Sequence, residues 1–461
     1  MEQAVHPFSS LRYVVHEKHS PGAPLRHLGR RSHGVREGRG ALQVVVRPGR
    51  GGRRHAGCPQ GARDRILRGG GEMISHRRDR GAFGHADPYP VERLRRVERP
   101  TTLIHDEQVQ QVDERESGFM RAGRGDFGPR LKEEYYRFVQ KHPLSNALVR
   151  MGFNLRKLVD GPVAPRQAPM TDDPAWNAGH IKETAYFLRA DLVGICELPR
   201  YAVYSWGAWH GGEKIELDHK YAVAVLIDQD TRTEMAFAGN DWISNSMSFM
   251  SYTTSGFIAC ILADYIRQLG YPARAHHALN YQVVLPPILL WAGLGEMCRI
   301  GDIVLNPFLG PRFKAAVVTT DMPLRVDKPI DFGLQDFCGK CGKCARECPS
   351  GAISQGEKVL HNGYEKWPNN VEKCTAMRVG NRHGSGCGTC IKVCPWSKPA
   401  TLFHRSVNWT MRHVPIARRF GIWGDDLMGY GRPDPRRKWW LDLEEVDKEL
   451  RVPPGKGAKE E

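Results

Sequence analysis

Eight cysteines gather between Cys338 and Cys394, and no other feature of the sequence limits the fold as strongly. They form two runs that each end in Cys-Pro, namely Cys338-x2-Cys341-x2-Cys344-x3-Cys348 and Cys374-x12-Cys387-x2-Cys390-x3-Cys394. Three thiolates at this close spacing let one loop wrap a cubane, and the cysteine before proline turns away to a second cubane. The pattern therefore predicts two [4Fe–4S] clusters in a ferredoxin-like module.

The two runs exchange one ligand each, because in two-cluster ferredoxins the cysteine before proline binds the other cluster. We assign cluster A to Cys338, Cys341, Cys344 and Cys394. We assign cluster B to Cys348, Cys374, Cys387 and Cys390. A pair of structural zinc sites is the alternative, but zinc needs neither the third closely spaced cysteine nor two Cys-Pro endings.

Four further cysteines are scattered along the chain: Cys58, Cys196, Cys260 and Cys298. Cys260 lies in an apolar stretch and Cys298 follows another, so we expect both to be buried small hydrophobes and not ligands. Clustered cysteines in a chain of this size indicate metal binding, since disulfides do not persist in a reducing compartment.

Most of the positive charge lies at the N-terminus. The chain carries a net charge of +16, and residues 1–72 hold 14 Lys and Arg against 5 Asp and Glu. This segment is dense in Arg, Gly and His without regularly spaced apolar residues, so we predict a disordered or misassigned basic extension, with Met73 as the alternative start. An RNA- or DNA-binding tail is disfavoured, because no aromatic residues interleave the arginines for base stacking.

No export signal or membrane span is predicted. Arg30 and Arg31 are adjacent, but no apolar stretch follows them as a twin-arginine signal requires. The apolar region from Val283 to Leu294 contains two prolines and is too short to cross a bilayer. We expect a cytoplasmic protein.

Apolar periodicity predicts a mixture of helices and strands before the cysteines. Helical spacing covers residues 131–139, 180–194, 249–269 and 288–297, and strands are expected at 221–227, 282–285 and 314–320. Such alternation is typical of an α/β core. We divide the chain into a basic extension (1–72), a polar and helical region (73–172), a core (173–335), the cluster module (336–400), and a C-terminal segment (401–461) that packs on the core and ends in a disordered tail.

Four short motifs precede the cysteines in a fixed order. They are Gly-Leu-Gly-Glu at 293–296, Gly-Pro-Arg at 310–312, Thr-Asp-x-Pro-Leu at 320–324 and Asp-Lys-Pro-Ile at 327–330. Together with the x12 gap after Cys374, they resemble the cobalamin-dependent reductive dehalogenases over about residues 174 to 405. The resemblance implies an α/β (α+β) nitroreductase-like corrinoid-binding core with the two-cluster module inserted, and a base-off corrinoid beside the nearer cluster.

The resemblance also names catalytic residues. It places the proton donor at Tyr252, because a phenol is neutral at pH 7 yet can donate when a nearby cation stabilises the phenolate. Lys314 would be that cation, with Arg312 as its competitor, and Asn280 would be a third polar group. Arg378 could bind a phenolate or carboxylate of the substrate as a planar bidentate donor, or it could pair with a cofactor side chain.

The function implied is reductive dehalogenation of an organohalide, with an aromatic substrate such as a halogenated phenol or hydroxybenzoate. Electrons would come from a separate ferredoxin or flavodoxin-type protein, since no dinucleotide fingerprint is visible. The nearest alternative is epoxyqueuosine reductase, which modifies tRNA and would need a basic folded core. A non-catalytic corrinoid or electron-transfer protein is the other, although it would not need both a large core and two clusters.

Overall fold

The computed structural model describes most of the chain after residue 88. The described residues are 89–138, 142–169, 172–208, 212–236, 243–380, 386–399, 401–438, 440, 444–446 and 449–451, all within one compact unit. The predicted basic extension 1–72, Met73, Cys58 and the last residues of the predicted tail lie outside them. The predicted segment boundaries stay predictions.

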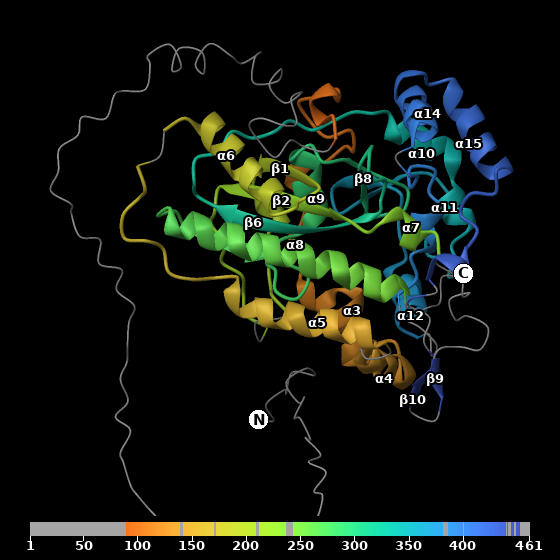
Figure 1. Ribbon diagram of the computed structural model, residues 1–461, viewed down its shortest axis with the longest axis horizontal. Helices are drawn as coiled ribbons and strands as arrows, with labels where there is room; N and C mark the ends of the chain where they lie inside the picture. The colour runs from red at the N-terminus through yellow and green to blue at the C-terminus, as the bar shows by residue number, and fades with distance from the viewer. Residues whose placement is uncertain are drawn as a thin grey trace, which may run out of the picture. The chain divides into compact units, whose positions relative to one another are not determined.

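A four-stranded antiparallel sheet forms the centre of the core, with strand order β1-β2-β6-β3 (Figure 1). Its strands are β1 (Leu192–Glu197), β2 (Tyr221–Asp228), β3 (Ala273–His276) and β6 (Phe313–Thr320). The strands predicted at 221–227 and 314–320 are confirmed as β2 and β6. Because every pairing is antiparallel, the core is of the α+β kind.

Both faces of this sheet are buried, so β2 and β6 are apolar at almost every position. Successive side chains of a strand point to opposite faces, and Val223 and Val225 pack on the face covered by α8 (Ile243–Gln268). Ala224 and Leu226 pack on the other face, with α9 (Leu285–Trp291). Helix α8 runs along the sheet, and α5 (Pro143–Leu155) packs on its outer side (Figure 1).

Three predicted elements differ from the structure. The helix predicted at 180–194 ends early, because α6 spans Pro174–Phe187 and Arg189 turns the chain into β1 with a φ of 77°. The strand predicted at 282–285 is wrong, since α9 begins at Leu285 with two prolines that suit a first helical turn. The helix predicted at 288–297 stops before Gly293, and Glu296–Met297 is strand β4, paired with β5 (Val304–Leu305).

The remaining elements surround the core. In chain order, α3 (Gly118–Arg124) and α4 (Pro129–Arg137) precede the strands of the core sheet, and α7 (Thr231–Glu234) follows β2. The cysteine module contains α10 (Leu334–Cys341), α11 (Lys343–Arg346), β7 (Val359–His361), β8 (Tyr364–Lys366), α12 (Val371–Val379) and α13 (Thr389–Lys392). After it come α14 (Leu402–His413), α15 (Ala417–Leu427), β9 (Glu444–Val446) and β10 (Glu449–Arg451).

Helix α8 is long and apolar enough to cross a membrane by length and composition alone. Its buried side chains, such as Ile258, Leu262 and Ile266, pack against the sheet. Packing against the sheet therefore explains why α8 is apolar.

Candidate active site and cluster centre

The structure brings two of the predicted catalytic residues together. The Lys314 ammonium nitrogen lies 5.2 Å from the centre of the Tyr252 ring. Lys314 is near the start of β6 and shares a strand face with Ala316 and Val318, which pack against α8. Tyr252 lies two helical turns before Ala259, on the side of α8 that meets the sheet. Both side chains therefore enter the seam between helix and strand, at the end where the apolar core stops.

Tyr252 is held in a rigid setting. Its ring is half-buried and lies 6.0 Å from the ring of Phe249, centre to centre. One residue earlier, the Ser251 hydroxyl donates to the Asp228 carbonyl oxygen at 3.2 Å and ties α8 to the end of β2. A phenol fixed on a helix beside an ammonium fixed on a strand is well placed for proton transfer, because neither group depends on a loop for its position.

Arg312, the competing cation, is engaged elsewhere. Its guanidinium donates to both carboxylate oxygens of Asp228, at 2.7 and 3.1 Å. Burial, the largest single influence, would lower the pKa of Arg312, but the hydrogen bonds that Arg312 donates to Asp228 and the negative charges of Asp228 and Glu234 together raise that pKa. Of the two predicted cations, Lys314 is thus the one beside Tyr252.

A buried carboxyl adjoins this ion pair, and nothing in the sequence had pointed to it. Glu234 has no exposed surface, and within the described residues neither of its carboxyl oxygens has a hydrogen-bond partner. Burial raises the pKa of Glu234 to about 8, although Arg312, whose Nε is 4.0 Å away, opposes this shift. The group is therefore mostly protonated at pH 7.

Asn280 belongs to a buried polar network. Its side-chain oxygen accepts from the Arg274 guanidinium at 2.8 Å, and its amide donates to the Arg156 carbonyl oxygen at 3.2 Å. These bonds tie the end of β3 to the turn that follows α5. A catalytic part for Asn280 stays a prediction.

Arg378 lies on the helix that carries a cluster ligand. It follows Cys374 by one turn of α12, and its guanidinium carbon lies 4.6 Å from the centre of the Phe119 ring. Phe119 meets the ring of Phe138 edge-on at 5.6 Å, and the Phe138 carbonyl oxygen accepts from the Asn245 side chain of α8 at 3.0 Å. Arg378 is thereby connected to the N-terminal part of the helix that carries Tyr252.

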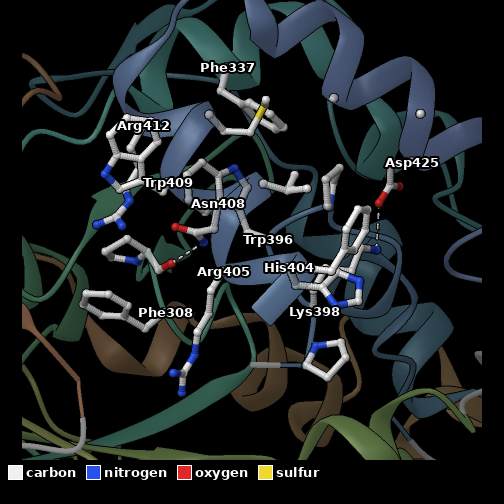
Figure 2. Close-up of a pocket in the computed structure, with 18 of the residues that line it drawn as sticks. Phe308, Phe337, Trp396, Lys398, His404, Arg405, Asn408, Trp409, Arg412 and Asp425 are labelled. Carbon is white, nitrogen blue, oxygen red and sulfur yellow. Dashed lines mark hydrogen bonds and ion pairs between the residues drawn. The ribbon is translucent and has the colours of Figure 1, made fainter. Parts of the chain in front are cut away.

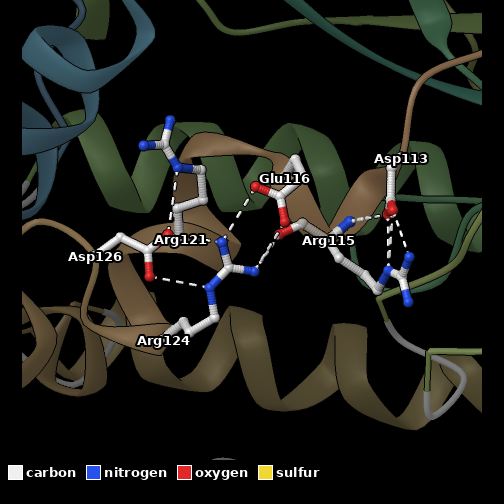
Figure 3. A network of polar contacts seen from close by, with 6 residues as sticks. All are labelled: Asp113, Arg115, Glu116, Arg121, Arg124 and Asp126. Carbon is white, nitrogen blue, oxygen red and sulfur yellow. Dashed lines mark hydrogen bonds and ion pairs between the residues drawn. The ribbon is translucent and has the colours of Figure 1, made fainter.

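Helix α3, the first α-helix of the described residues, packs closely against α12. A Cβ on Gly118 would come within 2.4 Å of the Thr375 hydroxyl, so α3 and α12 approach as closely as glycine allows. Arg121 of α3 forms an ion pair with Glu372 of α12 at 2.7 Å. Figure 3 shows the polar network that braces α3, in which Arg124 pairs with Glu116 and Asp126. Exposed pairs are individually weak, but a network holds a short helix better than a single pair.

The eight module cysteines lie in two adjoining groups, and the exchange of one ligand between the two clusters stays a prediction. Cys394 shares an apolar cluster with Cys338 and Cys341, and its electrostatic neighbours are Cys338, Cys344 and Cys341. The electrostatic neighbours of Cys390 are Cys387, Cys344, Cys374 and Cys348. Burial raises the pKa of the Cys394 and Cys390 thiols well above their ordinary value, so as free groups they would be neutral.

In the described part of the chain, no three His, Cys, Asp or Glu side chains converge closely enough for a single metal ion. A cubane holds its thiolates at separate corners instead.

Cys260 and Cys298 are buried as expected, and Cys196 is buried as well. Cys196, Cys260 and Cys298 expose 2%, 4% and 1% of their surface. Cys298 has a position that the sequence did not indicate, because it adjoins the thiols of Cys338, Cys344 and Cys394. It belongs to the apolar cluster that contains Cys338, Cys341 and Cys394, three of the ligands predicted for cluster A.

Comparisons with known proteins agree with this geometry. A family model described as a 4Fe-4S double cluster binding domain matches residues 337–397. The tetrachloroethene reductive dehalogenase of Sulfurospirillum multivorans is 31% identical over 307 residues, which cover 58% of this chain and 59% of that protein. The structure of the catabolic reductive dehalogenase NpRdhA superposes with a TM-score of 0.76 at 44% identity, over 80% of this chain and 54% of that one.

The chain is similar to reductive dehalogenases in both sequence and structure. Epoxyqueuosine reductase of Escherichia coli, the alternative considered from the sequence, matches more weakly, at 27% identity over 31% of this chain. The chain spans between 54 and 59% of the length of the relatives just described, NpRdhA and the Sulfurospirillum enzyme.

Sequence reasoning missed the residues that support the candidate site. Phe119, Asp228 and Glu234 lie far from the motifs along the chain, and each is an ordinary residue in its local pattern. The Asp-x-Asp-Thr turn after β2 indicates a helix start but not a partner for Arg312. Only tertiary contacts could have identified them.

Proposed function

We propose that this protein removes halide from an organohalide by reductive dehalogenation, with the balance R–X + H⁺ + 2e⁻ → R–H + X⁻. The observation that carries the proposal is the Lys314 ammonium over the ring of Tyr252. It supplies a phenol beside a cation, near a module that holds two electron-carrying clusters. We further propose that the sheet and its covering helices form a nitroreductase-like core and that the protein works in the cytoplasm.

Cobalamin is the cofactor that we propose for the junction of core and module. Buried polar atoms without a partner among the described residues occur on both sides of it: Gln229 Oε1, Arg312 Nη1, Trp396 Nε1 and Ser397 Oγ. The two sides meet closely, because a Cβ on Gly310 would come within 2.7 Å of the Trp396 carbonyl oxygen. Buried polar atoms normally have partners, and a corrinoid bears amide groups around its ring, so these residues would hold it. When bound, it would supply a strongly reducing cobalt centre.

The proton comes from Tyr252 in this proposal. Its hydroxyl donates to the carbon that loses halide, and the tyrosine becomes a phenolate. Lys314 stabilises that phenolate by its positive charge, which is more effective in a half-buried site than in water. Solvent then returns the proton to Tyr252 before the next turnover.

The substrate class follows from Arg378. A guanidinium that rests on the Phe119 ring keeps its edge free to form two parallel hydrogen bonds with a carboxylate or phenolate. An aromatic organohalide with an acidic oxygen, such as a halogenated hydroxybenzoate, suits this arrangement. One structure of NpRdhA contains 3-bromo-4-hydroxybenzoic acid, which supports the same substrate class for this chain.

Electrons travel one at a time through the two clusters. Cluster B shares α12 with Arg378, so it is the cluster nearer to the catalytic residues, and cluster A is the point of entry. A separate ferredoxin or flavodoxin-type protein supplies the electrons.

Anaerobic reconstitution of the full chain with iron, sulfide and cobalamin tests this function. We expect two [4Fe–4S] clusters and one cobalt per chain, and release of bromide from 3-bromo-4-hydroxybenzoate with a chemical reductant. Zinc in place of iron, or iron and cobalt incorporation without release of halide from any organohalide tried, would contradict the proposal.

A further inference from the structure

A groove of about 770 Å³ lies among α14, α15 and the loop that follows Cys394 (Figure 2). Aromatic side chains line it, including Phe308, Trp396 and Trp409, together with the basic Arg405 and Arg412. Of the residues proposed to hold cobalamin, only Trp396 lines the groove, and none of them or of the predicted catalytic residues lies on α14 or α15. The groove therefore calls for an explanation of its own.

The groove adjoins cluster A. Phe337, which lines it, directly precedes Cys338, and Trp396 follows Cys394 by two residues. Met411 of α14 belongs to the same apolar cluster as those two cysteines. Helices α14 and α15 are thus the layer that covers cluster A, and packed helices are only about 8 to 10 Å apart, axis to axis.

The outer face of this layer is unusually apolar. Ile416 at the N-cap of α15, and Phe420, Trp423 and Leu427 on the helix itself, are 77%, 71%, 65% and 69% exposed. Their spacing of four, three and four residues places them on one face of the helix. Contiguous apolar surface of this kind marks an interaction site in soluble proteins.

The same layer is basic. Between Thr401 and Gly424 the sequence has no Asp or Glu and four arginines, of which Arg405 and Arg419 are exposed and Arg418 is buried and paired with Asp336. The two acidic residues that follow, Asp425 and Asp426, are both paired with Lys343, at 2.6 and 3.0 Å. Lys398 also pairs with Asp425, and Arg346 also pairs with Asp426. A partner that fits this layer has an apolar tip surrounded by negative charge.

We propose that the α14–α15 layer is the docking surface for an acidic one-electron carrier, an iron–sulfur or flavin protein that reduces cluster A. The inference deepens the proposed function, because it rests on cluster A as the entry point for electrons. Complexes for electron transfer are typically small and weak, and complementary charge speeds their encounter. A second copy of this chain suits the surface less well, because a symmetric contact would oppose one basic layer to another.

The test is rapid-mixing reduction of the iron-loaded full chain, followed by bleaching of cluster absorbance. The reductant is a pre-reduced acidic ferredoxin, and dithionite serves as the small-molecule reference. The test variant is Arg405→Glu with Arg419→Glu, two exposed residues of the layer. Arg325→Glu, exposed on a segment that bonds to the start of α6, is the matched control.

We expect the second-order rate constant with ferredoxin to fall with added salt and to drop about 10-fold or more in the test variant. Reduction by dithionite should be unchanged, and the control should match the parent. A Phe420→Ser, Trp423→Ser variant should also slow ferredoxin and not dithionite. Because neither organohalide nor corrinoid is needed, this result is independent of whether the protein dehalogenates.

Three outcomes would overturn the proposal. The first is an unchanged ferredoxin rate in both variants. The second is a dimer, seen by light scattering, that the Phe420→Ser, Trp423→Ser variant dissociates, because a second copy would then cover the layer. The third is binding to anionic phospholipid vesicles that the same variant abolishes, because a membrane would then be the occupant.

Discussion

The core and the cluster module build their sites in different ways. The core takes Tyr252 from a helix and Lys314 from a strand, and the two meet only because α8 packs on the sheet. The module takes its ligands from short helices and loops whose spacing is set within the chain itself. A change in the core should therefore affect turnover and leave the clusters intact, whereas a change in the module should remove the cofactor as well.

The largest effect is expected from loss of a cluster ligand. Cys390→Ala should halve the iron content of the reconstituted protein and abolish halide release, because cluster B loses a thiolate. Iron analysis and a halide assay measure both. Cys260→Ala is the control, since that buried thiol donates only a weak bond to the Leu155 carbonyl oxygen. Full iron content in Cys390→Ala would show that the ligand assignment is wrong.

A change at the proton donor in the core should lower turnover without affecting the clusters of the module. Tyr252→Phe should lower the rate of halide release by about 10² to 10⁴-fold, the usual contribution of a general acid, with iron and cobalt content unchanged. Tyr265→Phe, on the same helix, is the control because its hydroxyl bonds to His180 at 2.8 Å. Turnover of Tyr252→Phe at nearly the parent rate would exclude Tyr252 as the donor.

Arg378 lies on α12 of the module, but its proposed role is to bind the substrate beside the catalytic residues of the core. Arg378→Met should raise the KM for 3-bromo-4-hydroxybenzoate by about 10-fold or more, since a charge-assisted hydrogen bond contributes about 1.5 to 3 kcal/mol. The KM for a neutral organohalide should stay the same, and both clusters should be retained. An equal loss for anionic and neutral substrates would argue for a structural role. Phe119→Leu should have a smaller effect of the same kind.

The smallest effect concerns the stability of the core. The fold raises the pKa of Glu234 from its ordinary value of 4.5 to about 8 because of burial. The protonated form therefore contributes stability that is fully present below pH 4.5 and is lost as the pH rises through about 8. Between pH 6 and pH 8.5 the melting temperature of the parent should fall by a few degrees more than that of Glu234→Gln. The exposed Glu197→Gln variant should behave as the parent does, and a parallel decline in all three would contradict the assignment.

The fold was predictable where the pattern was strong and local. The apolar runs of β2 and β6 and the long helix that ends before Gly270 were found from the sequence. Periodicity failed where two elements adjoin through a short link without Gly or Pro, as between α6 and β1. It also failed at Glu296, because two residues of strand are too few for any period, and their pairing with β5 is a tertiary contact.

The candidate site shows the same difference between what the sequence indicates and what only tertiary contacts decide. The predicted pairing of Tyr252 with Lys314 rested on resemblance, and the structure places the two side chains together. The choice of Lys314 over Arg312 needed Asp228, which attracts Arg312 from a neighbouring strand. The contact between Phe119 and Arg378 joins residues more than 250 positions apart, so no local sequence pattern could have predicted it.

By itself, the sequence determined the clusters, because thiolates two or three residues apart must converge on whatever they bind, whatever the rest of the chain does. Only the tertiary structure decided which cation faces the phenol, what holds Arg378 and which carboxyl is buried. Those properties depend on side chains from distant segments, and their charges act through space at distances that the packing of helices on a sheet sets.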